Sequence, residues 1–394
     1  MAARKIGILT LQNQLNYGGV LQAFALQRVL RDKGYDAEVV DYWLAPRNAR
    51  LNGYFFDPSR SWLRRMTRAA GFLLKRGAYY VRSDIARHRR TIRFIKENIA
   101  LSAVAYRSAK ELEGITGYAA LVVGSDQVWH YGFHGKPNPF LLGQVDASIR
   151  RVAYAASFGF TALPDAFLRE YQDGIGRFAA IGVREKEGVA LVKQWIGREA
   201  HWVLDPTLLL SERAWRQQLG PRPEGGPFTV CYWLGDTGKC AELVKALARR
   251  RETVHLYVEL QHLYSQKGLR GWLFRRRLFR MPHVKVCCGA GPQEFLTDLA
   301  HAAAVVSDSF HALQFSCLFR KPVKIFINSS AQRAGMAARM KDFAERYGIG
   351  GVLEEDVTGQ AFEPATPDYA AVWREIENDR CRSLGFLEDA LRLL

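Results

Sequence analysis

The segment SDSFHA, residues 307–312, places a histidine directly after the apolar run AAVV. Asp308 or Ser309 is a typical helix N-cap, and either would put His311 in or near the first turn of the helix that follows. Free backbone N–H groups and the positive end of the helix dipole favour an anion at that position. We therefore expect His311 to act as acid and base beside a bound anion. The simpler alternative is a histidine that only hydrogen-bonds a carbonyl group at a strand end.

Three further side chains at the ends of apolar runs could also do chemistry. Arg184 follows FAAIGV and could clamp an anion or form one half of an ion pair. Asp126 could act as a base or accept a hydrogen bond from a sugar hydroxyl, or it could cap a helix. Trp129 could stack on a sugar or fill the core. The polar residues beside them that could line the same site are Ser125, Gln127 and Ser157.

The stretch QLNYGGVLQAFALQ, residues 14–27, contains adjacent glycines between a strand-like run and a helix-like stretch. Its spacing is not GxGxxG, so it does not predict a dinucleotide site. We expect Asn16, Tyr17, Gly18 and Gly19 to form one wall of the active site, where the glycines let the backbone approach a ligand. The alternative is a plain turn, with Asn16 as a helix cap.

These polar clusters need a scaffold that brings strand ends together. Short apolar runs alternate with stretches of helical periodicity along the chain, which is typical of α/β proteins with parallel sheets. In such sheets ligands bind beyond the carboxyl ends of the strands. We expect an α/β fold with two Rossmann-like parallel-sheet domains that face each other across a cleft. The segment LDPTLLL, residues 204–210, is interpreted as structural, because Pro206 would end a strand and the leucines would pack.

Length and linker composition predict how the chain divides into domains. A chain of 394 residues exceeds one comfortable core. The Pro- and Gly-rich stretch GPRPEGGP, residues 220–227, is the best linker candidate. We expect an N-terminal domain over residues 1–219, with a basic helical insert at about 45–105, and a C-terminal domain over residues 220–394. The closing helix, at about 370–393, is a candidate to pack back on the first domain.

Much of the formal net charge of +17 lies in one stretch, residues 59–96. Leu63, Met66 and Leu73 recur there at helical spacing with arginines between them, which indicates a basic amphipathic helix. Three interpretations remain open: a helix packed on its domain with solvated arginines, a helix over residues 59–93 docked on an anionic membrane surface, or a nucleic-acid contact. No recognition module for nucleic acid accompanies the stretch, so we expect no nucleic-acid partner.

Composition also bears on location and metal content. No apolar run approaches the roughly 18 residues that a membrane span needs, and the N-terminal apolar run is too short for a signal peptide. We therefore expect a cytoplasmic protein. The six cysteines show no ligand spacing with one another or with histidine, so we expect reduced thiols, no disulfide and no structural metal.

Six motifs, taken in order, resemble the polysaccharide pyruvyl transferase family: NYGGVLQAFALQ, VVGSDQVW, YAASFG, GVREKEG, VLDPTLLL and VSDSFHALQFSCLFRKPV. The resemblance runs from about residue 5 to residue 350. It implies a GT-B-like fold of two Rossmann-like domains with the active site between them. It also implies transfer of a pyruvyl group from phosphoenolpyruvate to two hydroxyls of a sugar, which forms a cyclic ketal on a cell-surface polysaccharide or its lipid-linked precursor. That reaction requires no metal or redox cofactor, so phosphoenolpyruvate is the only expected co-substrate.

The resemblance also implies roles for individual residues. His311 and Arg184 would be catalytic. Many members have Arg-Leu-His where this chain has Ser309-Phe310-His311, a departure that removes one expected cation from the donor site. The candidate replacements are Arg333 and Arg339, which complete an implied phosphoenolpyruvate site of Arg184, Ser309, Phe310, His311, Arg333 and Arg339. A lipid-linked oligosaccharide acceptor would agree with a basic helix that holds the enzyme at the inner membrane face.

Two functions of other classes compete with this one. A nucleotide-sugar-dependent glycosyltransferase of GT-B type would need a ribose-binding carboxylate in the second domain, for which Glu294 and Asp298 are weak candidates. A non-catalytic scaffold that binds anions or membranes would need only the charge and the fold. Phosphate release from phosphoenolpyruvate in the presence of a sugar diol distinguishes the three.

Overall fold

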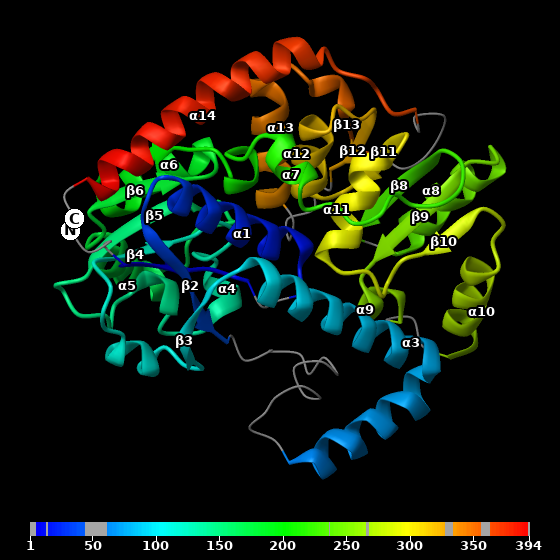
Figure 1. Cartoon of the computed structure of the whole chain (residues 1–394), viewed down its shortest axis with the longest axis horizontal. Coiled ribbons are helices and arrows are strands. Elements are labelled where there is room, and N and C mark those ends of the chain that lie inside the picture. The colour runs from blue at the N-terminus through cyan, green and yellow to red at the C-terminus, as the bar shows by residue number, and fades with distance from the viewer. Residues whose placement is uncertain are drawn as a thin grey trace.

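The computed structural model describes residues 5–12, 15–43, 61–235, 237–264, 268–327, 334–355 and 363–392. Two sheets organise these residues, and neighbouring named strands within each sheet run parallel (Figure 1). The first sheet has the strand order β3-β2-β1-β4-β5-β6-β7. Its strands are β1 Lys5–Leu9, β2 Asp36–Tyr42, β3 Leu101–Tyr106, β4 Ala120–Val123, β5 Arg150–Ala156, β6 Ala180–Val183 and β7 His201–Trp202.

The second sheet repeats this layout with the order β10-β9-β8-β11-β12-β13. Its strands are β8 Phe228–Trp233, β9 Thr253–Val258, β10 Val284–Val286, β11 Ala304–Ser307, β12 Val323–Phe326 and β13 Leu353–Glu354. In each sheet the strand that comes first in the chain, β1 or β8, lies in the middle. The next two strands extend the sheet to one side and the later strands extend it to the other, as in Rossmann-like domains. The expected fold class, two Rossmann-like parallel-sheet domains, is therefore confirmed.

Helices connect the strands in both domains. Those that precede the second sheet are α1 Tyr17–Asp32, α3 Trp62–Asn98, α4 Tyr131–His134, α5 Asp165–Ile175, α6 Lys186–Ile196 and α7 Glu212–Arg216, with 3₁₀ turns η1 Lys110–Gly114, η2 Pro139–Leu141 and η3 Pro206–Leu208. The others are α8 Thr237–Arg249, α9 Leu260–Leu263, α10 Gly268–Phe279, α11 Pro292–His301, α12 Phe310–Leu318, α13 Ala334–Arg346, the 3₁₀ turn η4 Gly350–Val352, and α14 Tyr369–Leu391. The central strand β4, with the sequence ALVV, is buried along its whole length, as expected for a sheet covered on both faces.

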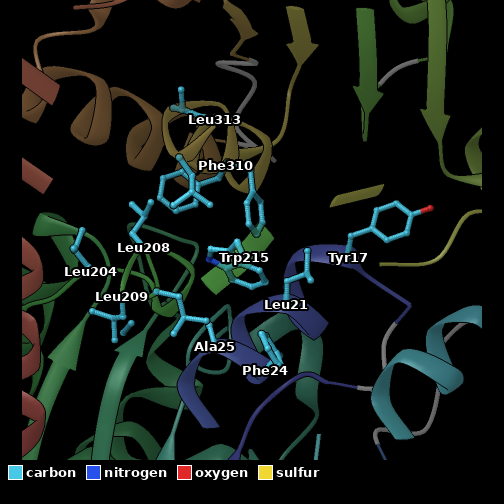
Figure 2. Packing of buried hydrophobic residues seen from close by; sticks show 14 of the residues in the cluster. Tyr17, Leu21, Phe24, Ala25, Leu204, Leu208, Leu209, Trp215, Phe310 and Leu313 are labelled. Atoms are coloured by element: carbon cyan, nitrogen blue, oxygen red, sulfur yellow. The ribbon is translucent and has the colours of Figure 1, made fainter. Parts of the chain in front are cut away.

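One hydrophobic cluster runs from the first domain into the second (Figure 2). Trp215 of α7 is fully buried at its centre. The Trp215 ring lies 5.5 Å from the Phe24 ring of α1 and 5.1 Å from the Phe315 ring of α12. Burying an aromatic ring of this size contributes several kcal/mol to stability. The packing therefore holds α1 and α12 together, and the candidate site lies at the N-terminal ends of these two helices.

The expected basic insert at about 45–105 differs from the structure in two ways. Its last residues form the edge strand β3, which pairs with β2; Ser102 and Tyr106 are buried there and residues 103–105 are exposed. The helix α3 is interrupted at Gly77, whose φ of 84° is left-handed and favours glycine. Beyond Gly77, α3 packs on the second domain: Arg90 Nη1 donates to Gly289 O at 2.6 Å. Residues 44–60 and the side chains of residues 64, 65, 68, 69 and 72–76 lie outside the described set.

The last helix, α14, bridges the two domains across the top of Figure 1. Near its start, Trp373 Nε1 donates to Cys317 O of α12 at 3.0 Å. Near its end, Arg150 Nε of β5 donates to Ala390 O at 2.8 Å. Among the described residues, no helix combines the length and the apolar character that crossing a bilayer would require.

Candidate active site

The catalytic candidate His311 lies where the two domains meet. Ser309 is the N-cap of α12, and its hydroxyl leaves the N–H groups of the first turn uncapped. His311 follows in that turn and packs against Gly18 of α1; a Cβ on Gly18 would lie 2.1 Å from His311 Nδ1. His311 is only 8% exposed, and its Nε2 has no hydrogen-bond partner in the described part of the chain. An unpaired ring nitrogen at a helix N-terminus is suited to exchanging a proton with a bound anion.

Asp205 connects the surroundings of His311. Its Oδ2 lies 3.7 Å from His311 Nε2 and accepts hydrogen bonds from Ser125 Oγ and Arg184 Nη1, both at 3.0 Å. Its Oδ1 accepts from the Thr207 hydroxyl and N–H at 2.8 and 3.0 Å. Burial alone would raise the pKa of Asp205, but His311, Arg184 and these donors hold that pKa well below its ordinary value. Asp205 is thus a fixed negative charge beside the imidazole.

Sequence reasoning missed this role, because the segment 204–210 was interpreted only as packing. The available signal was the one used for the other clusters: Asp205 is a polar residue just after a strand, β7. The neighbouring η3 turn does pack as expected, and its leucines are buried. Only the interpretation of Asp205 changes, from a packing segment to a residue of the site.

Arg184 forms ion pairs instead of standing open to a ligand. Besides Asp205, its guanidinium reaches Glu185 Oε1 at 3.1 Å and Asp126 Oδ1 at 3.5 Å, and its side chain is 1% exposed. Burial disfavours its charge, but the three carboxylates outweigh that effect and raise the pKa of Arg184. Of the two interpretations of Arg184, the geometry therefore supports the ion pair over the donor clamp. Arg184 positions Asp126 and Asp205.

Arg339 of α13 is a second buried cation at this site. Its side chain is buried, its Nε has no hydrogen-bond partner, and within the described residues it forms no salt bridge. Its guanidinium lies 5.8 Å from the Phe310 ring centroid, and that of Arg184 lies 5.2 Å from the same centroid. Burial, together with the charge of Arg184, lowers the pKa of Arg339 to about 10. Arg339 therefore stays charged at neutral pH, and the carboxylates of Glu185, Asp126 and Asp205 offset its charge only in part. Arg333, the other candidate cation, lies outside the described residues.

The loop after β4 carries Ser125 and Asp126 into the same site. Gln22 of α1 holds this loop, because its Oε1 accepts from Ser125 N at 2.9 Å. The Gln22 amide in turn donates to Thr10 Oγ1 at 2.7 Å. Asp126 has a φ of 69°, a left-handed conformation that aspartate tolerates. Ser125 and Asp126 thus lie in one cluster with Arg184 and Asp205, and their contact with an acceptor stays a prediction.

The two glycines differ in what they contact. Gly18 makes room for the imidazole, whereas a Cβ on Gly19 would lie 2.9 Å from Leu11 O. Asn16 caps α1, because its Oδ1 accepts from Gly18 N at 3.0 Å and Gly19 N at 3.4 Å. The close approach at Gly18 is thus to a side chain of the other domain, and Asn16 acts as the cap that was the alternative.

Other predicted wall residues are enclosed. Tyr17 stacks on Phe295 of the second domain at 4.5 Å, and its hydroxyl donates to Ala290 O at 3.0 Å, so it joins the domains and has no open face. Trp129 is fully buried in the first-domain core and donates to Phe140 O at 3.3 Å, which excludes stacking on a sugar. Ser157 is also buried, although its Oγ has no partner in the described set.

Gln127 remains partly exposed. Its Nε2 lies so close to Gly159 that a Cβ there would be 1.9 Å away. The contact places the Gln127 amide beside the loop that follows β5. Among the predicted wall residues, Asn16 and Gln127 are the two that are partly exposed.

The carboxylates proposed for ribose binding are engaged elsewhere. Asp298 Oδ2 accepts from the Tyr257 hydroxyl at 2.6 Å and lies 2.7 Å from His255 Nδ1. Glu294 caps α11 and pairs with Arg90 at 3.1 Å. Cys287 lies within 4.8 Å of the His255 and Asp298 ligand atoms. Burial raises the pKa of Cys287 to about 12, which disfavours the thiolate that a metal would need.

Solved structures of similar layout have low sequence identity to this chain. They include S. aureus MnaA with UDP (10% identity, TM-score 0.47, covering 99% of this chain and 98% of that one) and a Methanocaldococcus jannaschii UDP-GlcNAc 2-epimerase (10%, 0.45, 95% and 91%). Another is Acinetobacter baumannii MurG (7%, 0.42, 98% and 99%). These likenesses bring no activity to this chain. No curated protein matches it significantly.

The sequence profile described as polysaccharide pyruvyl transferase matches residues 16–330, more than half of the chain. The matched range contains Gly18, Arg184, Asp205 and His311, which converge on one site in the structure. The chain therefore belongs to the polysaccharide pyruvyl transferase family.

Proposed function

We propose that this protein transfers the pyruvyl group of phosphoenolpyruvate to two hydroxyls of a sugar in a polysaccharide or its lipid-linked precursor. The observation that carries the proposal is the buried guanidinium of Arg339, which forms no salt bridge with a described residue, shares the Phe310 ring with Arg184 and lies by the first turn of α12. Phosphoenolpyruvate carries about three negative charges at neutral pH. A buried cation whose charge is only partly offset, beside the uncapped N–H groups of a helix N-terminus, is what such a ligand requires.

The proposed reaction needs two proton transfers. The enol methylene of phosphoenolpyruvate gains a proton and becomes a methyl group, and its former C2–O–phosphate bond breaks. Two sugar oxygens form bonds to C2 and each loses a proton. One of these protons balances the new methyl hydrogen, and the other leaves with hydrogen phosphate. Charge is conserved, because a trianion becomes a ketal carboxylate and a dianion.

His311 is our candidate for moving the first proton. Its unpaired Nε2 could give a proton to the methylene carbon and take one from the attacking hydroxyl. Asp205, 3.7 Å away, would stabilise the imidazolium form. Arg339 would hold the donor anion. Arg184 acts through Asp205 and Asp126 and is a positioning residue.

The direct test measures phosphate release from phosphoenolpyruvate with a panel of galactosides, mannosides and hexosamines, both simple and lipid-linked. Product mass should rise by one pyruvic acid less one water. His311→Ala should fold normally and lose at least about a hundredfold in turnover. The control is His301→Ala, which removes an imidazole whose Nδ1 lies 3.0 Å from Thr297 O in its own helix.

Three results would contradict the proposal. Normal turnover by His311→Ala would move the proton transfer to another group. Consumption of a UDP-sugar without use of phosphoenolpyruvate would identify the nucleotide-sugar glycosyltransferase. An absence of turnover with either donor, across the whole acceptor panel, would favour the non-catalytic scaffold.

A further inference from the structure

Two stretches of the chain are rich in cations and contain no carboxylate. Residues 58–83 carry seven Lys or Arg residues, and residues 260–293 carry another seven, with no Asp or Glu in either. The first stretch contains the beginning of α3 and the second contains α10. Of these fourteen cations, five lie in α3 before Gly77 and four lie in α10.

The helix α10 also exposes large apolar side chains. Leu269 is 70% exposed and Trp272 is 48% exposed. They are three residues apart and therefore lie on one face of the helix. Arg276, one turn further on, places its guanidinium 5.0 Å from the Trp272 ring. Apolar residues with cations one turn away form the pattern of a helix that lies in a membrane interface.

The beginning of α3 shows the same combination. Trp62, Leu63 and Met66 are exposed, Trp62 by 71%. Figure 1 shows this part of α3 projecting beyond the body of the protein below the second domain. Just after Gly77, the Tyr79 ring lies 4.3 Å from the Phe279 ring at the end of α10, so the two helices are neighbours at that point.

We propose that α10 and the part of α3 before Gly77 dock on an anionic lipid bilayer. The exposed tryptophans and leucines would enter the headgroup region, and the surrounding cations would attract acidic lipids. A nucleic acid could pair its phosphates with the cations, but it would leave the exposed side chains of Leu63 and Leu269 in water. A second copy of the chain would oppose two strongly basic faces, which repel each other.

The sequence predicted a membrane contact over residues 59–93. This proposal limits that contact to the residues before Gly77 and adds α10. After Gly77, α3 packs on the rest of the protein. Arg87 Nη2 donates to Leu15 O and to Glu259 Oε1, both at 2.7 Å. Deleting the whole segment would therefore disturb the contact between the domains. Point substitutions on the exposed residues avoid that effect. The proposal does not depend on which donor the active site uses.

The test is co-sedimentation of the full chain with vesicles of phosphatidylcholine alone or with 30% phosphatidylglycerol, a composition chosen for the assay. Wild type should bind the acidic vesicles at least about tenfold more tightly than the neutral ones. Trp62→Ser/Leu63→Ser and, separately, Leu269→Ser/Trp272→Ser should each weaken that binding about tenfold or more. Arg276→Glu should do the same and should make the remaining binding less sensitive to salt.

Matched controls lie on the first domain. Val104→Ser changes an apolar side chain that is 58% exposed on β3, and Arg169→Glu changes an exposed arginine on α5. Both should bind vesicles as wild type does. Equal binding to neutral and acidic vesicles, or unchanged binding by either double variant, would overturn the two-helix surface. It would also be overturned if duplex DNA displaced the protein from vesicles, or if Leu269→Ser/Trp272→Ser dissociated a dimer measured by light scattering.

Discussion

The imidazole of His311 lies against the backbone of Gly18, so that a Cβ on Gly18 would be 2.1 Å from His311 Nδ1. The two residues belong to different domains. Residue 18, at the start of α1, must therefore be glycine because any side chain there would occupy the place of the His311 ring from the second domain. This contact links the first motif of the chain to its last.

Gly18→Ala should displace the imidazole and reduce pyruvyl transfer by about a hundredfold, because small displacements of a reacting group cost orders of magnitude in rate. The measurement is turnover with phosphoenolpyruvate and the best acceptor, alongside a thermal unfolding curve. Gly143→Ala is the control, because a Cβ at Gly143 meets nothing within 4 Å. Equal activity of Gly18→Ala and Gly143→Ala would show that the imidazole position is not critical.

Asp205→Asn should lower kcat more than it changes the KM for phosphoenolpyruvate, because Asp205 acts on His311 and not on the donor. It should also destabilise the fold by about 3 kcal/mol at pH 7, because the buried Arg184 loses one of its carboxylate partners. Since the folded-state pKa of Asp205 is depressed, its contribution is complete above about pH 4 and is lost as the pH falls further.

Urea unfolding of wild type and Asp205→Asn at pH 7 and pH 3 checks this sign. The difference in unfolding free energy should shrink at the lower pH. Asp165→Asn, which changes an exposed carboxylate in the first turn of α5, should show little difference at either pH. A difference between wild type and Asp205→Asn that grew on acidification would refute the assignment of Asp205 as the paired carboxylate.

Arg339→Met should stabilise the free protein while abolishing donor binding. Because the pKa of Arg339 is lowered to about 10, the charged guanidinium opposes folding at every pH below that value. Removing it should raise the unfolding free energy at pH 7 by roughly 1 to 3 kcal/mol. Phosphoenolpyruvate should raise the Tm of wild type but not that of the variant.

The matched control for Arg339 lies two turns along the same helix. Arg346 pairs with Asp379 of α14, so Arg346→Met should lower the Tm and leave the donor-induced shift in place. If Arg339→Met destabilised the protein as much as Arg346→Met does, Arg339 would be a structural cation with a counter-charge. If Arg339→Met kept the donor-induced shift, it would not hold the donor.

Local patterns in the sequence predicted the fold well. The alternation of apolar runs and helical stretches depends on neighbours in the chain, so the two parallel sheets could be foreseen. The position of His311 was predicted for the same reason, since the cap and the strand before it lie within a few residues.

What could not be foreseen depends on long-range partners. Arg184 pairs with three carboxylates, and two of them, Asp126 and Asp205, lie 58 and 21 residues away from it in the chain. The sequence around Trp129 is compatible with a residue that stacks on a sugar and with a residue of the core, and only its neighbours in space distinguish the two. Leu101–Tyr106 is too short and too mixed in character to identify as an edge strand without the partner β2.

The path of α14 restricts how the domains can move. The chain passes from the first sheet to the second near residues 220–227 and returns through α14, which contacts α12 near its start and β5 near its end. The chain therefore joins the two domains twice, once near residues 220–227 and once through α14. Any motion of one domain relative to the other must preserve both connections, which favours rotation about the line through them over sliding.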